Sequence, residues 1–435
     1  MKSIASVLSI IALGVGLLSC SGGDGGGQSS PSAFLYVSNS GGNDISAYSV
    51  DTNTGVLTPL VGSPFAAGAN PQGMTLSTTG SQVLAFVSNA GSATVSSYIV
   101  NTGTGLLTPA SVAPFTTGVN PRTLTLEPFG RFAFVANAGT SNPNSTVSVY
   151  RVNTTTGILT EVLPGSPFPV ALGIQPQQAT VVTVSSTKQF VYLANAMSTN
   201  VSGFSLDTNS GFLTLVGGSP FAVGTTPQSV VADSAGNFVY VSNEGSSNVS
   251  AFKVDRTNGF LSSTVPTASF AAGSLPQPVT LHPSKPFAYV ANAGSNNLSA
   301  YFVDALTGEL SVITNPGQPV TNFFGAGSTP QQVTIDPSGK FALVANAGSI
   351  NVSVYEINQT NGTLVEVTGS PFPSGGLSQR VTVDPTGKFV FVPNAGTNDV
   401  SVYQLNSTTG DLTPVAGSPF AAGTGPKFVT TAGTF

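Results

Sequence analysis

The hydrophobic and polar positions of residues 330–372 predict four short β-strands in succession. An unbroken apolar run, FALVA at 341–345, is typical of a strand that is covered on both faces. The tetrapeptide Asp336-Pro337-Ser338-Gly339 before it favours a type I turn, and Asn361-Gly362 favours a hairpin. The predicted strands are residues 332–335, 341–345, 352–357 and 363–367. The segment is therefore predicted to be a four-stranded unit.

The same pattern occurs eight times, and most of the chain consists of its copies. In each copy an asparagine, here called a ring asparagine, ends the second predicted strand, and successive ring asparagines are 48 to 58 residues apart. They are Asn39, Asn89, Asn137, Asn195, Asn243, Asn292, Asn346 and Asn394. Repeated four-stranded units that bury their faces only against one another are the blades of a propeller. The predicted fold class is therefore all-β, an eight-bladed β-propeller of four-stranded blades.

The two ends of the chain complement each other. The first copy begins at Phe34, inside its second strand, and lacks a first strand. Residues 426–431, PKFVTT, supply a leftover first strand after the last complete copy. We therefore expect residues 34–435 to form one domain whose N- and C-terminal strands pair and close the ring, which leaves no exposed edge. A seven-bladed ring with one displaced unit is the alternative.

The composition predicts a polar but weakly charged surface. Only 7% of the residues are charged, against about 25% in typical soluble domains. The 12 Lys and Arg residues are scattered along the chain, and the formal net charge is −5. We therefore expect no basic patch and no nucleic-acid partner.

The first 20 residues differ from the repeat. Lys2 precedes an apolar stretch at residues 4–18, and Leu17-Leu18-Ser19-Cys20 ends it in a way that resembles the lipobox of a bacterial lipoprotein. This resemblance implies a signal peptide at residues 1–19, a lipid on Cys20 and a flexible Gly- and Ser-rich tether at 20–33. The expected location is the bacterial cell envelope, at the periplasmic face or the cell surface, with the membrane as a partner through the lipid. An uncleaved anchor is the alternative, although the stretch is short for a span of about 20 residues.

The loops that lead into the first strands form the candidate binding site, because the innermost strands of a propeller line a central channel. Each loop carries a proline, or Ser378 in one copy, and the next residue is polar in all eight copies. These residues are Gln72, Arg122, Gln177, Gln228, Gln277, Gln331, Gln379 and Lys427. They predict a channel mouth ringed by amides and two cations, which could take a protein or glycan ligand. The alternative is that the glutamines only bond neighbouring loop backbones.

Departures from the repeat bear on chemistry. Glu244 follows its ring asparagine where the other copies have Ala or Ser, and His282, the only histidine, takes a turn position held elsewhere by Asp or Glu. With one histidine and one cysteine in the chain, a Ser-His-Asp triad and a multi-histidine metal site are excluded. We expect no metal and no cofactor. We interpret the ring asparagines as turn formers that bond the backbone two residues on.

The motifs DPTGKFVFV at 384–392 and ANAGS at 291–295, with a closing Gly-Ser-Pro-Phe, recur along residues 34–431. In these motifs the chain resembles the lactonase-type β-propellers related to 6-phosphogluconolactonase and, more loosely, the YVTN repeats of surface proteins. The resemblance implies seven blades and a site that combines a Pro-Arg-His entry to a first strand with an Asn-Glu pair after a second. Pro121-Arg122 and Asn243-Glu244 match, but Thr123 stands at the histidine position. The resemblance therefore implies Arg122 and Glu244 as catalytic candidates without their histidine base.

Two functions are compatible with these features. The first interpretation is a monomeric, lipid-anchored binding or interaction module with an unknown ligand and no catalysis. The alternative is a lactone hydrolase that acts on a sugar lactone, which requires Glu244 to lie at the same channel mouth as Arg122. Residues 138–146, the one lengthened loop after a ring asparagine, are a further candidate for partner contact.

Overall fold

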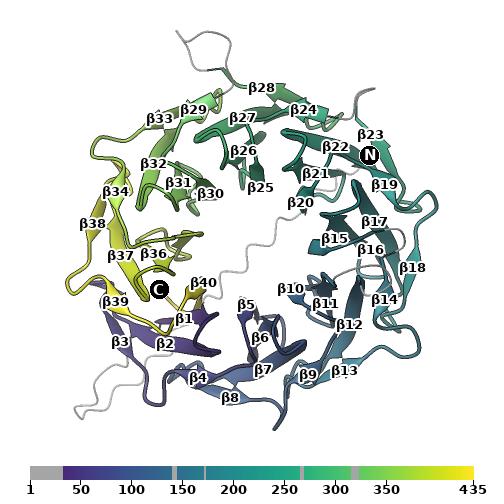
Figure 1. Cartoon of the computed structure of the whole chain (residues 1–435), viewed down its shortest axis with the longest axis horizontal. Coiled ribbons are helices and arrows are strands. Elements are labelled where there is room, and N and C mark those ends of the chain that lie inside the picture. The colour runs from purple at the N-terminus through teal and green to yellow at the C-terminus, as the bar shows by residue number, and fades with distance from the viewer. Residues whose placement is uncertain (1–32, 140–144, 171–172, 265–268, 315–322) are drawn as a thin grey trace, which may run out of the picture. The chain divides into compact units, whose positions relative to one another are not determined.

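The structure is a computed structural model that describes residues 33–139, 145–170, 173–264, 269–314 and 323–435. These residues form eight antiparallel sheets arranged as the blades of a ring (Figure 1). The predicted eight-bladed β-propeller is confirmed, and the seven-bladed alternative is wrong. Residues 1–32, with Cys20, and residues 140–144 of the lengthened loop lie outside the described residues. Within the described part, no helix is long and apolar enough to cross a membrane.

In each blade, an inner, a second and a third strand follow one another outward from the central channel (Figure 1). The inner strands are β5 (Pro71–Ser77), β10 (Pro121–Leu126), β15 (Pro176–Ser185), β20 (Pro227–Ala232), β25 (Pro276–Leu281), β30 (Pro330–Ile335), β35 (Thr382–Val383) and β40 (Pro426–Gly433). The second strands are β1 (Ala33–Asn39), β6 (Val83–Asn89), β11 (Phe132–Asn137), β16 (Lys188–Asn195), β21 (Phe238–Asn243), β26 (Phe287–Asn292), β31 (Phe341–Asn346) and β36 (Phe389–Asn394). The third strands are β2 (Asp44–Val50), β7 (Thr94–Val100), β12 (Thr146–Val152), β17 (Asn200–Leu206), β22 (Asn248–Val254), β27 (Asn297–Val303), β32 (Asn351–Ile357) and β37 (Asp399–Leu405).

The fourth, outer position holds two short strands, both paired with the third strand. The first of each pair is β3 (Leu57–Pro59), β8 (Leu107–Pro109), β13 (Leu159–Glu161), β18 (Leu213–Leu215), β23 (Leu261–Ser263), β28 (Leu310–Val312), β33 (Leu364–Glu366) or β38 (Leu412–Pro414). The second is β4 (Phe65–Ala66), β9 (Phe115–Thr116), β14 (Phe168–Pro169), β19 (Phe221–Ala222), β24 (Ser269–Ala271), β29 (Phe323–Gly325), β34 (Phe372–Pro373) or β39 (Phe420–Ala421).

This division of the outer strand is a feature that the sequence pattern did not predict. In the β30–β34 blade, β33 pairs with one end of β32 and β34 pairs with the other. The Gly-Ser-Pro-Phe motif lies between them, and the Ser370 hydroxyl accepts the backbone N–H of Val354 (3.0 Å). Because proline has no N–H to donate, the ladder is interrupted there. At this interruption the serine hydroxyl is the acceptor for the Val354 N–H, and Phe372 then re-enters the sheet opposite Val352.

The ring is closed by the two ends of the chain. The sheet order β3-β2-β1-β40 puts the C-terminal strand beside the first described strand (Figure 1). Val37 lies opposite Val429, and Leu35 lies opposite Thr431. Val429 belongs to the buried apolar cluster that this blade shares with the β35–β39 blade. The predicted pairing of the termini is therefore confirmed.

The contact between a phenylalanine and a glycine joins almost every pair of neighbouring blades. The phenylalanine lies on the second strand of one blade, and the glycine lies in the hairpin turn of the next blade at positive φ. The pairs are Phe34 with Gly105, Phe132 with Gly211, Phe190 with Gly259, Phe238 with Gly308, Phe287 with Gly362, Phe341 with Gly410 and Phe389 with Gly55. Leu84 takes the place of the phenylalanine opposite Gly157. A side chain at these glycines would overlap the ring, so the turn glycine is a packing requirement as well as a backbone one.

Hydroxyl groups add polar contacts across the same joins. Tyr36 donates to the carbonyl oxygen of Gly105 (2.7 Å), and Tyr192 donates to that of Gly259 (2.7 Å). Around the channel, Thr75 on β5 donates to the carbonyl oxygen of Leu124 on β10 (2.9 Å). These bonds satisfy buried polar groups and set the angle between blades.

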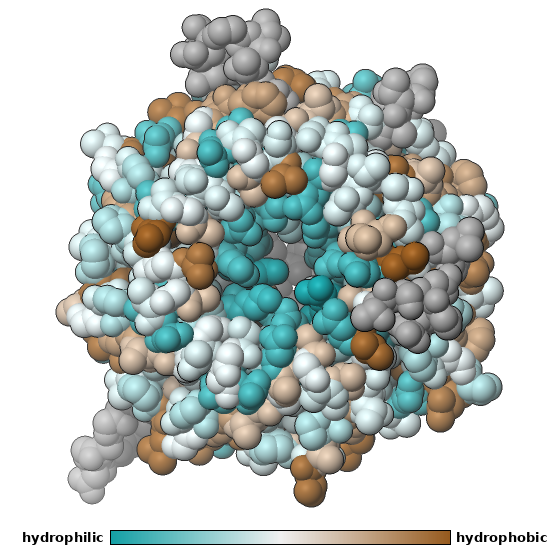
Figure 2. Space-filling view, viewed as in Figure 1, coloured by the Kyte–Doolittle hydropathy of each residue, from teal (hydrophilic) through white to brown (hydrophobic). Residues whose placement is uncertain are grey.

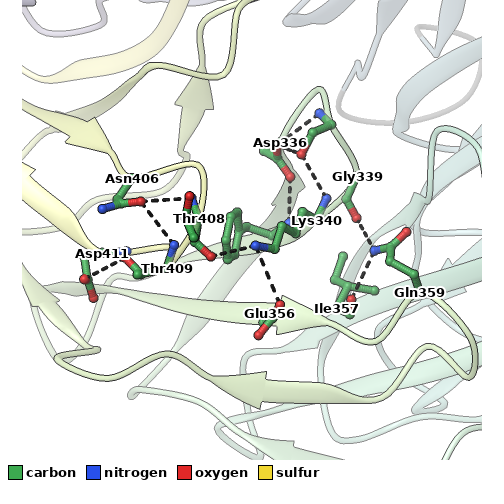
Figure 3. A network of polar contacts seen from close by, with 12 residues as sticks. Asp336, Gly339, Lys340, Glu356, Ile357, Gln359, Asn406, Thr408, Thr409 and Asp411 are labelled. Atoms are coloured by element: carbon green, nitrogen blue, oxygen red, sulfur yellow. Dashed lines mark hydrogen bonds and ion pairs between the residues drawn. The ribbon is translucent and has the colours of Figure 1, made fainter.

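At the turns after the inner strands, a lysine side chain bridges two blades and a glutamine side chain joins two turns of one blade. Lys340 Nζ donates to the carbonyl oxygen of Thr408 in the next blade (2.6 Å) and lies 3.8 Å from the Glu356 carboxylate (Figure 3). Gln359 Nε2 donates to the carbonyl oxygen of Gly339 (2.9 Å). The blades are thus joined by polar contacts at the rim and by apolar packing between their faces.

Removal of the closing strand should open the ring. We expect a chain ending at Gly425 to lose cooperative unfolding or to melt at a much lower temperature, because one sheet edge and one blade face would be exposed. A milder variant, Val429→Ala, should cost about 2 kcal/mol of unfolding free energy through the cavity it leaves. Thermal and urea unfolding measure both. The exposed Val365→Ala is the matched control, and a shortened chain with parental stability would contradict closure by β40.

The Phe–Gly contact predicts that adding a single methyl group at the glycine strongly lowers the free energy of unfolding. Gly308→Ala should lower the unfolding free energy by about 2–4 kcal/mol, because it adds backbone strain at positive φ and overlaps the Phe238 ring. Gly217 has an open environment and no positive φ, so Gly217→Ala should stay within about 0.5 kcal/mol of the parent. Urea unfolding of the two variants side by side measures the difference. Equal stabilities would show that the contact does not hold the blades.

Candidate functional site

The inner strands all begin on one face of the disc, here called the mouth face. On this face the proline before each inner strand lies opposite the ring asparagine of the second strand, as in Pro71 with Asn89 and Pro330 with Asn346. In the β35 blade Ser378 replaces the proline and pairs with Asn394 as an isolated bridge. The loops before the inner strands and the loops after the ring asparagines therefore share the mouth face, as the repeat predicted.

The ring asparagines are structural but act differently from the prediction. All eight are fully buried. The Asn292 Nδ2 donates to Asn297 Oδ1 (2.8 Å) and Ser299 Oγ (2.9 Å), and every other copy makes the corresponding pair of contacts. The amide thus bonds side chains at the start of the third strand, rather than the backbone two residues on. It holds the second and third strands together below the mouth.

A β-bulge at the start of the inner strands turns two consecutive side chains toward the channel. In β5, Pro71 pairs with Asn89 and Gly73 pairs with Ser88, so Gln72 is an extra residue in the ladder. Similar irregularities occur at the start of six of the seven other inner strands. A bulge re-aims a side chain, so both the first and the second residue after the proline face the channel.

These residues enclose a cavity of about 500 Å³ at the centre of the ring. All eight residues predicted for the channel mouth line it: Gln72, Arg122, Gln177, Gln228, Gln277, Gln331, Gln379 and Lys427. Hydrophilic side chains surround the central opening in the space-filling view (Figure 2). Several glutamines donate to their own loop backbone, for example Gln277 Nε2 to the carbonyl oxygen of Leu275 (3.1 Å). These amides are oriented by the loops while they line the cavity.

A third cation in the cavity was missed by the sequence analysis. Arg380 follows Gln379 and also lines the cavity, with Phe428 beside it. Its guanidinium lies over the Phe428 ring, 4.9 Å from the ring centroid. The sequence analysis took only one residue per loop as facing the channel, whereas two consecutive residues of this loop line the cavity. Tabulating the second position of each copy would have revealed Arg380 as its only charged residue.

Arg380 and Lys427 lie on neighbouring blades, and the β5 blade separates the blade of Lys427 from the β10 blade of Arg122. Lys427 Nζ donates to Gln72 Oε1 (2.6 Å). Burial lowers the pKa of Lys427, and the charges of Arg122 and Arg380 lower it further. Burial also lowers the pKa of Arg380. No aspartate or glutamate is among the residues that line this cavity. The described lining is therefore electropositive and rich in amides, which suits an anionic or polyhydroxylated ligand.

Glu244 lies at the same mouth, next to the cavity lining. Its carboxylate Oε2 accepts a hydrogen bond from Gln228 Nε2, and Gln228 lines the cavity. Its backbone N–H donates to the carbonyl oxygen of Thr226 (2.9 Å) in the loop before β20. The β15 blade separates the β20 blade of Gln228 from the β10 blade of Arg122, and among the described residues no ion pair joins Glu244 to Arg122. One hydrogen bond therefore connects the carboxylate to the cavity.

His282 lies at the other end of the blade, in the turn between β25 and β26. It is buried; Nε2 donates to the carbonyl oxygen of Gly339 (2.8 Å), and Nδ1 accepts the N–H groups of Ser284 (3.2 Å) and Lys285 (3.0 Å). The side chain thus performs the turn role that Asp336 performs in its own copy, where Asp336 Oδ1 accepts the N–H of Phe341 (2.6 Å). In the described part of the chain, no group of three or more His, Cys, Asp or Glu residues could hold a metal ion.

Comparison with known families agrees with this geometry. The chain matches the family described as Lactonase, 7-bladed beta-propeller over residues 28–114, 86–274, 263–376 and 380–431. The chain belongs to this lactonase family. The resemblance found in the sequence is thereby confirmed, although this lactonase-family ring has eight blades instead of the seven in the family description. Membership favours the lactone hydrolase alternative over a binding module without catalysis.

Solved structures of similar fold support the architecture of this lactonase-family propeller. A candidate 6-phosphogluconolactonase from Bacteroides uniformis is 18% identical, with a TM-score of 0.61, and covers 93% of this chain and 100% of its own. The periplasmic gluconolactonase PpgL of Pseudomonas aeruginosa is 16% identical, with a TM-score of 0.58, and covers 93% of this chain and 99% of its own. At such identities the likeness shows the fold alone. No curated protein sequence matches the chain.

The environment of His282 predicts a pH dependence of stability. Burial lowers the pKa of His282 and the charge of Lys285 lowers it further, although the Gly339 carbonyl and Asp336 act in the opposite direction. The unfolded chain therefore binds this proton at a pH near 6.5, before the folded protein does. The stabilising contribution is complete above that pH and is lost as the pH falls toward the lower, folded pKa.

We therefore expect the unfolding free energy to fall between pH 7.5 and 5.5. Because His282 is the only histidine, His282→Asn should flatten this part of the profile. Urea unfolding at a series of pH values measures it. A parental profile that does not decline over this range would contradict the assignment.

Proposed function

We propose that this propeller hydrolyses a sugar lactone at its channel mouth. The observation that carries the proposal is the cavity of about 500 Å³, lined by amides and three cations, in a chain that belongs to the lactonase family. The hydroxyl groups of a sugar lactone match the ring of glutamine amides, which both donate and accept hydrogen bonds. The cavity is of the size that ligand pockets for small molecules have.

The reaction needs two kinds of group. A water oxygen attacks the lactone carbonyl carbon, the carbonyl oxygen becomes an oxyanion, and the ring C–O bond then breaks as the leaving oxygen takes a proton. A cation at the developing oxyanion stabilises the transition state, and Arg122 supplies such a cation in the cavity lining. Its Nε is buried without a hydrogen-bond partner among the described residues.

Proton transfer is assigned to Glu244. A lactonase of the Pro-Arg-His type would use a histidine, but Thr123 occupies that position and donates its hydroxyl to the carbonyl oxygen of Gln177 (3.1 Å). Glu244 is the carboxylate that hydrogen bonds to the cavity lining, through Gln228. A carboxylate that accepts a proton from the attacking water can act as general base. The Gln228 amide would orient this carboxylate toward the water.

A binding module without catalysis is the second candidate. One observation favours it: the residues that line the cavity contain neither a carboxylate nor a histidine. In that case the same amides and cations would hold a polar ligand, and Glu244 would serve only to position Gln228. The two candidates share the site and differ in whether the bound molecule is changed.

The location of the protein remains a proposal based on Cys20. β1 runs from Ala33 to Asn39, and Asn39 lies on the mouth face, so the chain enters the ring on the opposite face. We propose that Cys20 carries a lipid that attaches the chain to a membrane. A Cys20→Ala variant that stays in the membrane fraction would contradict lipid attachment.

Lactone hydrolysis tests the proposal directly. The parent should accelerate hydrolysis of glucono-δ-lactone or its 6-phosphate above the spontaneous rate. Glu244→Gln should lower the enzymatic rate by about 100-fold or more, as expected when a general base is lost. The matched control is Glu309→Gln, at an exposed turn position, which should leave the rate unchanged. A parent that binds these lactones without hydrolysing them would favour the binding module, and a Glu244→Gln rate equal to that of the parent would remove Glu244 from the mechanism.

A further inference from the structure

We propose that Arg122, Arg380 and Lys427 form an oxyanion-binding site across the closure of the ring, and that its occupation holds the closing strand β40 in place. The ligand group is a carboxylate or a phosphate. The site lies in the cavity of the proposed function. The inference rests on that function only for the part of the ligand beyond its carboxylate or phosphate group. Anion binding can be measured without turnover, so the two proposals can fail separately.

The closing strand contributes two groups to the site. Lys427, the second residue of β40, lines the cavity and reaches the next blade through its bond to Gln72 Oε1 (2.6 Å). Phe428, also on β40, lies under the Arg380 guanidinium of the preceding blade at 4.9 Å. Side chains of β40 therefore contact both neighbouring blades inside the cavity.

The positive charge of this region is not balanced within the described residues. The cavity lining contains three cations and no carboxylate. The two ion pairs of the described residues lie elsewhere, Arg131 with Glu127 and Lys340 with Glu356. No hydrogen bond within the described part connects the Arg380 guanidinium to an acceptor, and the Nε of Arg122 is buried without one. Guanidinium groups left without acceptors in a cavity are suited to a carboxylate or phosphate, which they bind through paired, charge-assisted hydrogen bonds.

Repulsion among these cations acts on the strand that closes the ring. The pKa of Lys427 is lowered partly by the charges of Arg122 and Arg380, which is a sign that the three groups repel one another. An anion between them replaces repulsion with attraction. Because a ligand that binds only the closed ring stabilises it by mass action, occupancy should favour the paired state of β40 over an opened one.

The first experiment measures anion affinity on the full chain by calorimetry at low ionic strength. Inorganic phosphate and tartrate serve as phosphate and carboxylate probes, with chloride at equal ionic strength as the reference. We expect saturable binding of phosphate or tartrate beyond the effect of chloride, and the probe with the tighter binding identifies the oxyanion. Lys427→Gln and Arg380→Gln should each weaken it by about tenfold or more, because each removes charged hydrogen bonds. Lys253→Gln, at an exposed position of β22, should bind like the parent.

The second experiment tests the link to closure by amide hydrogen exchange. The bound anion should slow exchange in β40 and β1 more than in β20 and β21, which lie in a blade that does not contain the chain ends. Uniform slowing in both blades would overturn the closure part of the proposal. Phosphate and tartrate responses no larger than that of chloride, or parental affinity in both Lys427→Gln and Arg380→Gln, would overturn the site.

Discussion

The fold depends on one constraint: every blade is buried only by its neighbours. The second strand of each blade is apolar on both faces and is buried throughout in six of the eight copies. Its phenylalanine can reach the next blade only where the turn of that blade has no side chain, and this accounts for the turn glycine of each copy. A ring built in this way has no independent core, and the pairing of β1 with β40 completes the one blade that contains both chain ends. Fold stability and closure are therefore one property of this chain.

The repeat made the fold predictable from the sequence. The period of the ring asparagines, the turn glycines and the unpaired end segments each agreed with an eight-bladed closed ring, and local and global signals that agree are those that specify a structure. The positions of the mouth residues followed from the same register, because a residue at a fixed place in each copy lies at a fixed place around the ring. What this reasoning could not predict was geometry within a strand. The bulges at the start of the inner strands, and the return of Phe372 to the sheet after a proline, break the period-two rule on which strand patterns rest.

The role of the ring asparagines was also beyond the sequence pattern. An asparagine before Ala-Gly is typical of a turn that bonds its own backbone. Here the backbone of the turn is already bonded, for example by the N–H of Asn296 to the carbonyl oxygen of Asn292 (3.0 Å). The amide is therefore free to bond side chains of the third strand. One of its two partners there is a buried serine, such as Ser299 for Asn292. A local motif thus serves a contact between strands, and only the three-dimensional register reveals which residue receives it.

The departures from the repeat separate structure from function. His282 stands where other copies have Asp and, like Asp336, accepts the backbone N–H two residues on, so it keeps a turn role. Arg122, Arg380 and Lys427 depart from neutral residues at positions that face the cavity, where no packing contact requires a charge. Lys427 lies on the closing strand, Arg380 on the preceding blade, and Arg122 on the second blade after it. An anionic ligand would then contact the join that the ring needs most, and this is the physical reason to consider binding and closure together in a propeller whose two ends meet within a single blade.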